Sequence, residues 1–187
     1  MRAPAAFAAL LAALALGACG SDDDGGDKEP TEEKPAAQAE GGTTFEASDV
    51  GFTFEHPEEF KQENADQGKV IATLKLDEEN GLNIRKSSDQ ALPPSFYLDE
   101  FERDFERSPD VGDVQKKTAR YGGRETGVLV IADAPSAVPG SKKRVRAEEY
   151  FFAGDGKTWQ LECLSTEEKR SEVDVACKQA LGSIKFP

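Results

Sequence analysis

The chain has 187 residues, of which 36 are acidic and 23 basic, and its formal net charge is −13 at pH 7. Such a surface repels the phosphates of nucleic acids and of anionic lipids, so the charge argues against a nucleic-acid partner and against direct adsorption on a membrane. One histidine and three cysteines leave few groups for nucleophilic or metal chemistry.

The first eighteen residues have the composition of a secretory signal peptide. Arg2 gives a charged start, and an apolar run over residues 7–16 that is almost wholly alanine and leucine follows it. This run is shorter than the roughly 20 residues that cross a bilayer as a helix. We therefore expect residues 1–18 to be an export signal that takes no part in the fold.

The segment Leu16-Gly17-Ala18-Cys19 resembles the lipobox of bacterial lipoproteins, in which the cysteine is lipidated and becomes the new N-terminus. We expect acyl chains such as palmitate on Cys19, and a protein anchored in the cell membrane that faces outside the cytoplasm. Each buried methylene adds about 0.8 kcal/mol, so two or three chains anchor firmly. The alternative is ordinary cleavage after Ala18, which would leave an exposed thiol unpaired.

Residues 19–42 are expected to be the lipidated cysteine followed by a disordered acidic tether. Residues 20–42 hold eight acidic and two basic residues, with no aromatic or branched aliphatic side chain that could form a core. The run Asp22–Asp24 lacks the alternating acids and central glycine of a calcium loop, so we interpret it as a charged spacer. Residues 43–187 keep a net charge of −8, which should hold them off an anionic membrane.

Residues 43–187 are expected to form one α+β domain, large enough to bury around two thirds of its unfolded surface. Segments of alternating apolar and polar residues, separated by turn residues, predict the following strands: 51–55, 70–76, 82–85, 114–121, 125–132 and 145–164, the last broken at 154–156. Asn80-Gly81 predicts a hairpin turn between the second and third. The run Val128–Ile131 does not alternate, which favours a central strand that is covered on both faces.

A first amphipathic helix is predicted over residues 95–107. Tyr97, Phe101 and Phe105 recur at four-residue spacing and share one face, while charged residues occupy the rest. Core packing is the simpler interpretation of this aromatic stripe, and a ligand groove is the alternative.

A second helix is predicted to follow a capping box formed by Ser165 and Glu168 and to stop near Gly182. Its buried face should carry an apolar residue at nearly every turn, namely Val173, Cys177, Leu181 and Ile184.

Cys163 and Cys177 are expected to form a disulfide. Trp159, Leu161 and Cys163 share a strand face by their period of two, and Cys177 belongs to the buried face of the second helix, so both thiols point inward. Exported chains favour the oxidised state, and a closed loop of 15 residues gives roughly 3 kcal/mol in the chain-entropy model. The rival interpretation, a zinc site, lacks ligands, because two cysteines and the distant His56 do not supply four.

Known catalytic motifs are missing from the sequence. It has no G-x-S-x-G, no H-E-x-x-H, no phosphate loop and no G-x-G-x-x-G after a strand. His56 precedes Pro57 at an expected strand end, which favours a structural role over that of a general base. We therefore expect a protein that is not an enzyme, with no catalytic residue, cofactor or metal. A glycosidase-like carboxylate pair is the alternative that the many acids leave open.

The order of the elements over most of residues 44–187 resembles the PsbP-like domain of small bacterial lipoproteins. The segments that carry the resemblance are Gly51–Pro57, Phe96–Phe101, Gly156–Cys163 and Ile184–Phe186. The resemblance implies an antiparallel β-sheet flanked by helices, an α/β/α sandwich, and a role as an accessory or binding module without a shared enzymatic centre. It implies no metal-linked role, because no ligand set of the photosynthetic members matches this chain.

Two hypotheses about function follow. The first is a non-enzymatic binding or accessory module at the cell envelope, whose ligand is a protein or an envelope component. The second is a carrier of a small molecule or lipid, with Tyr97, Phe101 and Trp159 lining an aromatic cavity. Likeness of fold alone does not decide between them.

Overall fold

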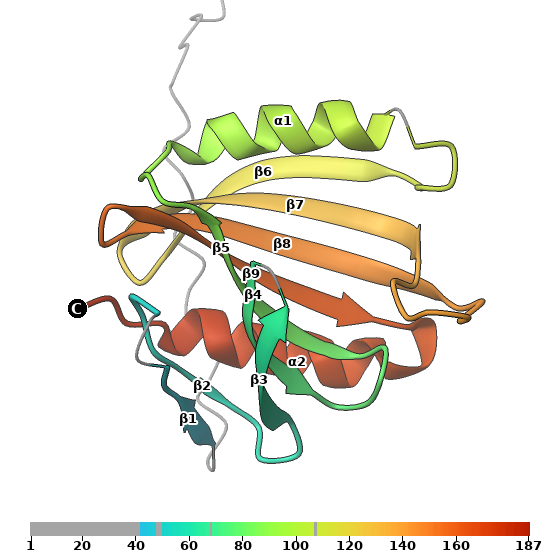
Figure 1. Ribbon diagram of the computed structural model, residues 1–187, viewed down its shortest axis with the longest axis horizontal. Helices are drawn as coiled ribbons and strands as arrows, with labels where there is room; N and C mark the ends of the chain where they lie inside the picture. Colours follow the sequence, from blue (N-terminus) through green and yellow to red (C-terminus); the bar gives the residue numbers. More distant parts are fainter. Residues whose placement is uncertain (1–41, 48–49, 68, 107) are drawn as a thin grey trace, which may run out of the picture.

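The computed structural model describes residues 42–47, 50–67, 69–106 and 108–187. The expected signal peptide, Cys19 and nearly all of the expected tether lie outside the described residues. The elements in chain order (Figure 1) are β1 (Thr43–Phe45), β2 (Phe54–His56), β3 (Lys61–Gln67), β4 (Val70–Lys75), β5 (Gly81–Ser88), α1 (Pro94–Glu106), β6 (Val114–Tyr121), β7 (Arg124–Pro135), β8 (Arg144–Gly154), β9 (Lys157–Ser165), the 3-10 turn η1 (Glu167–Lys169) and α2 (Arg170–Ser183).

Seven strands form one antiparallel sheet in the order β3-β4-β5-β9-β8-β7-β6, and β1 pairs with β2 beside it. Two-residue turns close two of its hairpins, Gly122-Gly123 between β6 and β7 and Asp155-Gly156 between β8 and β9. All four turn residues have positive φ, between 54° and 77°. Such turns match the right-handed twist of the paired strands.

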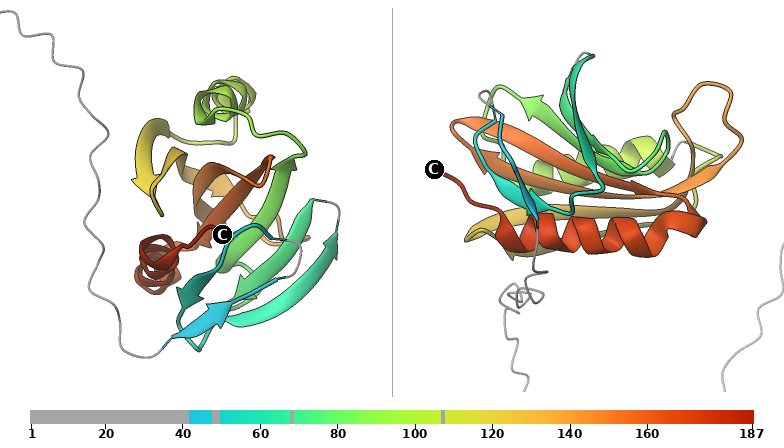
Figure 2. Two further views of the ribbon diagram at one scale, coloured as in Figure 1. Left: turned by 90° about the vertical axis from the view of Figure 1, so that its left-hand side faces the viewer. Right: turned by 90° about the horizontal axis from the view of Figure 1, so that it is seen from below.

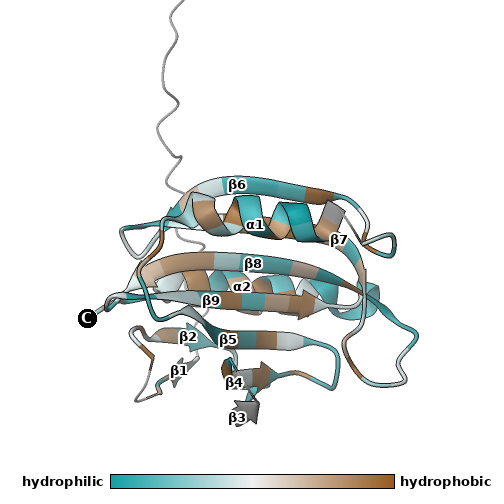
Figure 3. Cartoon of the chain, turned by 45° about the horizontal axis from the view of Figure 1, so that its top comes forward, coloured by the Kyte–Doolittle hydropathy of each residue, from teal (hydrophilic) through white to brown (hydrophobic). Residues whose placement is uncertain are grey.

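The two helices cover opposite faces of this sheet (Figure 2). On one face, α1 packs over β6, β7 and β8. Its N-terminal end lies close to β7 because Gly127 has no side chain: a Cβ there would be 3.0 Å from Cβ of Pro94 and 3.2 Å from Cγ of Leu98. The apolar residues of α1 alternate with exposed polar ones, as the colours of Figure 3 show. The buried residues of this layer are Tyr97, Leu98, Leu129, Ile131, Ala147 and Phe151.

On the other face, α2 packs against β2, β9 and β5. It contributes Val173, Ala176, Cys177, Ala180 and Leu181 to the larger core. Five phenylalanines fill that core beside it, namely Phe45, Phe52, Phe54, Phe60 and Phe152. The expected fold class, an antiparallel sheet flanked by helices, is confirmed.

The elements differ from the sequence-based expectation mainly at their ends. The first helix begins one residue early, at Pro94, and its last described residue is Glu106. The expected hairpin around Asn80-Gly81 is present, but Lys75 pairs with Gly81, so the loop spans residues 76–80. In this loop Oδ1 of Asp77 accepts hydrogen bonds from the backbone N–H groups of Glu79 and Asn80.

The expected capping box of the second helix is wrong. Ser165 is the last residue of β9, and α2 begins only at Arg170, after η1. The physical reason is a competing partner: Oδ1 of Asn80 accepts hydrogen bonds from the N–H and the hydroxyl of Thr166, at 2.6 and 3.1 Å. These bonds hold the chain in a turn where a helix was expected to start.

Candidate functional site

A groove of about 830 Å³ lies between α2 and the β6–β8 part of the sheet. It exists because α2 packs over β2, β5 and β9, while β6, β7 and β8 continue beyond the helix. We call it the α2 groove.

Aliphatic and aromatic side chains form part of the floor of the α2 groove. Val130 of β7 lies there, and Tyr121 and Tyr150 place their rings edge to face, with centroids 5.7 Å apart. Leu181 and Cys177 contribute the wall on the helix side. A flexible apolar chain or ring could lie on this floor.

Charged side chains surround this floor, and the basic ones outnumber the acidic. The basic residues that line the groove are Lys116, Lys117, Arg120, Arg146 and Lys178, and the acidic ones are Asp113, Glu148 and Asp174. Nζ of Lys116 is paired with Asp99 and Glu102 of α1 on the other face of the sheet. The remaining lining has four basic and three acidic side chains, an excess of one positive charge in a domain whose net charge is −8. A cleft of one sign with low-dielectric walls concentrates ligands of the opposite charge.

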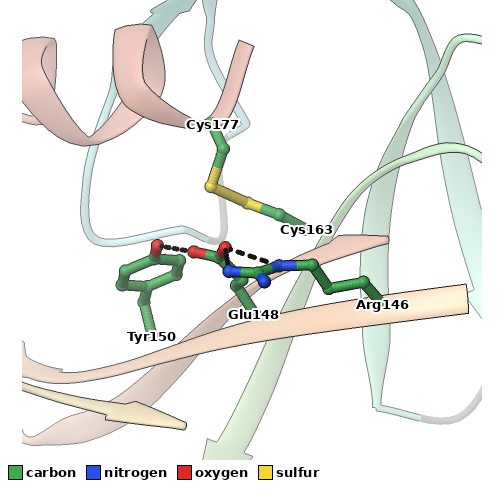
Figure 4. The surroundings of a disulfide bond; sticks show 5 residues. All are labelled: Arg146, Glu148, Tyr150, Cys163 and Cys177. Carbon is green, nitrogen blue, oxygen red and sulfur yellow. Dashed lines mark hydrogen bonds and ion pairs between the residues drawn. A yellow bond between two sulfur atoms is a disulfide. The ribbon is translucent and has the colours of Figure 1, made fainter. Parts of the chain in front are cut away.

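Glu148 is held as an anion at the edge of this floor (Figure 4). The hydroxyl of Tyr150 donates to its Oε2 at 2.5 Å, and Nε of Arg146 donates to its Oε1 at 3.0 Å. Burial opposes the charge on this carboxylate, but the hydrogen bonds from Tyr150 and Arg146 outweigh burial and lower the pKa of Glu148. The guanidinium of Arg146 therefore forms an ion pair with Glu148 at the edge of the groove.

A disulfide joins Cys163 of β9 to Cys177 of α2, with Cα atoms 6.2 Å apart. Cys163 is the register partner of Glu148, so this bond crosses beside the hydrogen-bonded cluster of β8 (Figure 4). It fixes the helix wall of the groove to the sheet.

The structure does not bring Tyr97, Phe101 and Trp159 together. Tyr97 stacks on Phe151 with ring centroids 5.1 Å apart, Phe101 contacts the same ring, and both line a separate cavity of about 310 Å³ beside α1. Trp159 is 1% exposed and faces α2, with its Nε1 donating to the carbonyl of Gly154. The alternation of β9 placed Trp159 and Cys163 on one face of the sheet. The sequence did not indicate that α1 covers the opposite face.

His56 ends β2, where the sequence placed a strand end. Its ring is 2% exposed, and Nδ1 donates to the carbonyl of Pro57 at 2.9 Å. Among the residues that the structure describes, no group of three or more His, Cys, Asp or Glu side chains could hold a metal ion. No helix within the described ranges has the length and apolar character of a membrane span.

The basic side chains of the groove were missed from the sequence, although β6 carries a signal for them. In this strand Gln115, Lys117 and Tyr121 fall on one face by their period of two, and only Ala119 between them is buried. A strand with a mostly polar inner face predicts a surface that no helix covers. The missing information was the position of α2, which the strand does not encode.

No protein-family model matches the chain, and comparison with curated protein sequences gives no match. Solved structures do match. The crystal structure of LpqN, involved in cell envelope biogenesis of Mycobacterium tuberculosis, superposes with a TM-score of 0.53 at 11% identity, covering 79% of this chain and 91% of that one. The solution structure of cyanobacterial PsbP (CyanoP) from Synechocystis sp. PCC 6803 gives a TM-score of 0.49 at 10% identity, covering 78% and 92%.

The fold is shared with LpqN. It has the antiparallel sheet and the two flanking helices that the order of the elements led us to expect. At this identity the likeness concerns the fold alone and carries no site residue over to this chain.

Proposed function

We propose that this protein is a non-enzymatic binding module of the cell envelope, held at the outer side of the cell membrane by lipid on Cys19. We further propose that the α2 groove binds an anionic amphiphile, such as an acidic lipid. The observation that carries the proposal is the combination of a partly apolar floor with a basic rim on an otherwise acidic domain.

The dimensions and chemistry of the groove suit such a ligand. Its volume of about 830 Å³ falls within the range of roughly 300–1,000 Å³ typical of small-molecule sites. Lys117 of β6 and Lys178 of α2 stand on opposite walls and would contact the anionic headgroup. Val130 and Leu181 would contact an acyl chain, which gains about 0.8 kcal/mol for each methylene that leaves water.

The setting of the proposal rests on two further observations. The disulfide between Cys163 and Cys177 suits an oxidising compartment outside the cytoplasm. LpqN, which shares the fold, is described as involved in cell envelope biogenesis, and we extend to this chain only that general setting.

The test is a titration with two lysolipids of equal chain length. Lysophosphatidylglycerol carries a net negative charge and lysophosphatidylcholine does not, so we expect the former to bind roughly tenfold more tightly, a difference of about 1.4 kcal/mol. Charge reversals on either wall, Lys117→Glu and Lys178→Glu, should each remove most of that preference. Binding is followed by isothermal titration calorimetry below the critical micelle concentration.

The matched control is Lys142→Glu, which makes the same charge change at an exposed residue in the loop between β7 and β8. It should keep the wild-type preference because it lies outside the groove lining. Equal affinity for both lysolipids, or equal loss in all three variants, would show that the groove does not select an anionic amphiphile.

A further inference from the structure

The cavity beside α1 is a separate feature from the α2 groove, since it lies on the opposite face of the sheet. We call this cavity of about 310 Å³ the α1 cleft. Tyr97 and Phe101 of α1 line one side of it. The other side consists of polar residues from three neighbouring strands, namely Arg85 of β5, Glu149 of β8, and Gln160 and Glu162 of β9.

Two of these residues, Glu149 and Glu162, are direct register partners on adjacent strands, yet their surroundings differ. Oε2 of Glu162 accepts hydrogen bonds from Nη2 of Arg85 at 2.8 Å and from Nδ2 of Asn83 at 2.7 Å. Arg85 and Glu162 thus form an ion pair on this side of the cleft.

Glu149 lies deeper and has no such cation of its own. It is 4% exposed, and Nε2 of Gln160 donates to its Oε2 at 3.0 Å. Burial above all, and then the negative charge of Glu162, raise the pKa of Glu149 to about 8, with Arg85 opposing the shift. At neutral pH Glu149 is mostly a carboxylic acid, and its O–H is a hydrogen-bond donor.

Tyr97 also lines this cleft, and its buried hydroxyl has no hydrogen-bond partner among the described residues. The side chain is 4% exposed, and its ring is fixed by stacking on Phe151 at an interplanar angle of 3°. A buried hydroxyl without a partner lowers the stability of the fold, because its hydrogen bond to water is lost on folding and not replaced. A ligand oxygen in the cleft would replace that bond.

The remaining charges around the cleft do not favour either sign. Two basic residues, Lys69 and Lys86, and two acidic residues, Glu100 and Asp104, line its rim. Lys86 is further paired with Asp89 at 2.7 Å. The cleft therefore offers donors without a net charge, and the group that fits such donors is an uncharged acceptor. A carbonyl oxygen accepts from a phenol and from a neutral carboxylic acid alike.

We propose that the α1 cleft binds an uncharged molecule through a carbonyl oxygen, with Tyr97 and Glu149 as hydrogen-bond donors and the Phe101 ring as the apolar contact. This site is independent of the α2 groove, and its ligand is small, because the cleft has less than half the volume of the groove.

The experiment uses three probes of the same size: benzamide is uncharged, benzoate is an anion and benzylammonium is a cation. Binding is followed through the ring signals of ¹³C-labelled Phe and Tyr, which stay observable at high pH. At pH 6.5 we expect saturable shifts at Phe101 with benzamide, at a Kd in the millimolar range typical of so small a ligand. Tighter binding of benzoate or of benzylammonium, or no saturable shift with benzamide, would overturn the proposal.

The two donors are tested by separate variants. Tyr97→Phe keeps the ring that stacks on Phe151 and removes only the hydroxyl, so benzamide should bind about five- to tenfold more weakly. Unchanged binding by this variant would exclude the hydroxyl as a donor.

Glu149 is tested through pH. Wild-type affinity for benzamide should fall about tenfold between pH 7 and pH 9, because ionisation removes the donor. Glu149→Gln keeps an N–H donor at every pH, so its affinity should not change over that range. Glu125→Gln is the matched control: Glu125 is exposed on β7, and this variant should keep the wild-type pH dependence. An affinity that rises with pH would contradict the assignment.

Discussion

Glu149 makes the stability of the fold depend on pH in a direction that is unusual for a carboxyl group. An ordinary paired carboxylate has a lowered pKa and stabilises a protein as pH rises. Burial and the charge of Glu162 raise the pKa of Glu149 to about 8 instead. The folded state then keeps a proton that the unfolded state releases near pH 4.5, so stability falls as pH rises between those two values.

This linkage predicts a measurable slope. From pH 5.5 to pH 7.5 the wild-type free energy of unfolding should fall by about 2 kcal/mol more than that of Glu149→Gln, because one proton contributes about 1.4 kcal/mol per pH unit. The glutamine should also be the more stable of the two at pH 7.5, since it can still accept the hydrogen bond of Gln160. Urea unfolding at the two pH values measures both quantities, and parallel curves for the two proteins would show that Glu149 ionises normally.

At this scale the sequence predicts which face of a strand a residue occupies better than it predicts what covers that face. Period two places Trp159, Leu161 and Cys163 on one face of their strand, and in the structure all three belong to the core on the α2 side of the sheet. The alternation does not reveal that Glu149 lies opposite Glu162, because the register of these strands depends on the two-residue turn at Asp155-Gly156. The paired acids were therefore not predicted as a site.

Among the elements, α2 depends most on residues that are distant in sequence, because long-range contacts hold both of its ends. Before the helix, the side chain of Asn80 accepts a hydrogen bond from the N–H of Thr166. At the end of the helix, the hydroxyl of Ser183 donates to the carbonyl of Gln179 and accepts from the N–H of Glu55. The disulfide at Cys177 adds a covalent link near the middle of the helix. The apolar spacing of the sequence located the body of this helix, but the predicted capping box was wrong, and the segment before the helix is held by Asn80, which is 86 residues away from Thr166.

Removing the disulfide should lower the free energy of unfolding by roughly 3 kcal/mol, the value that the chain-entropy model gives for a loop of this size. Cys163→Ala with Cys177→Ala is the suitable variant, because both side chains are buried among apolar residues and alanine introduces no polar group there. Urea unfolding of this variant measures the loss. Wild-type protein that is unfolded in the presence of a reductant provides an independent comparison. A loss below about 1 kcal/mol in both experiments would mean that the packing of α2 already restricts the chain.

The strands that were not expected share one property, which is weak apolar patterning. The sequence of β3, KQENADQ, has only one apolar residue, and it forms a strand because it pairs along the edge with β4. A polar strand at the edge of a sheet has no burial signal for sequence analysis to detect, and charged edges also discourage pairing with other chains. The central strands, whose burial is encoded in their residues, were found.

At the scale of the whole molecule, the net charge of the domain and the proposed lipid anchor have opposite effects on membrane binding. Residues 43–187 have a net charge of −8, so an anionic membrane surface repels the domain as a body, while the α2 groove concentrates positive charge locally. The proposed anchor at Cys19 would overcome this repulsion without any contact between the domain and lipid headgroups. Membrane association then depends on acyl chains, and ligand binding depends on the groove.

This separation predicts that two variants fail in different ways. Cys19→Ser should move the protein from the membrane fraction to the soluble fraction of its host, whereas Lys117→Glu should stay with the membrane and lose only the preference for anionic lysolipid. Membrane-bound wild type should also resist a wash with 1 M salt, which shortens the screening length to about 3 Å and would release a protein held by charge.

The mass of the detergent-extracted wild type should correspond to a chain that starts at Cys19 and carries diacylglycerol and a further acyl group. Cys19→Ser that still sediments with membranes after the salt wash would contradict the anchor, and the groove would then have to be tested as the membrane contact itself.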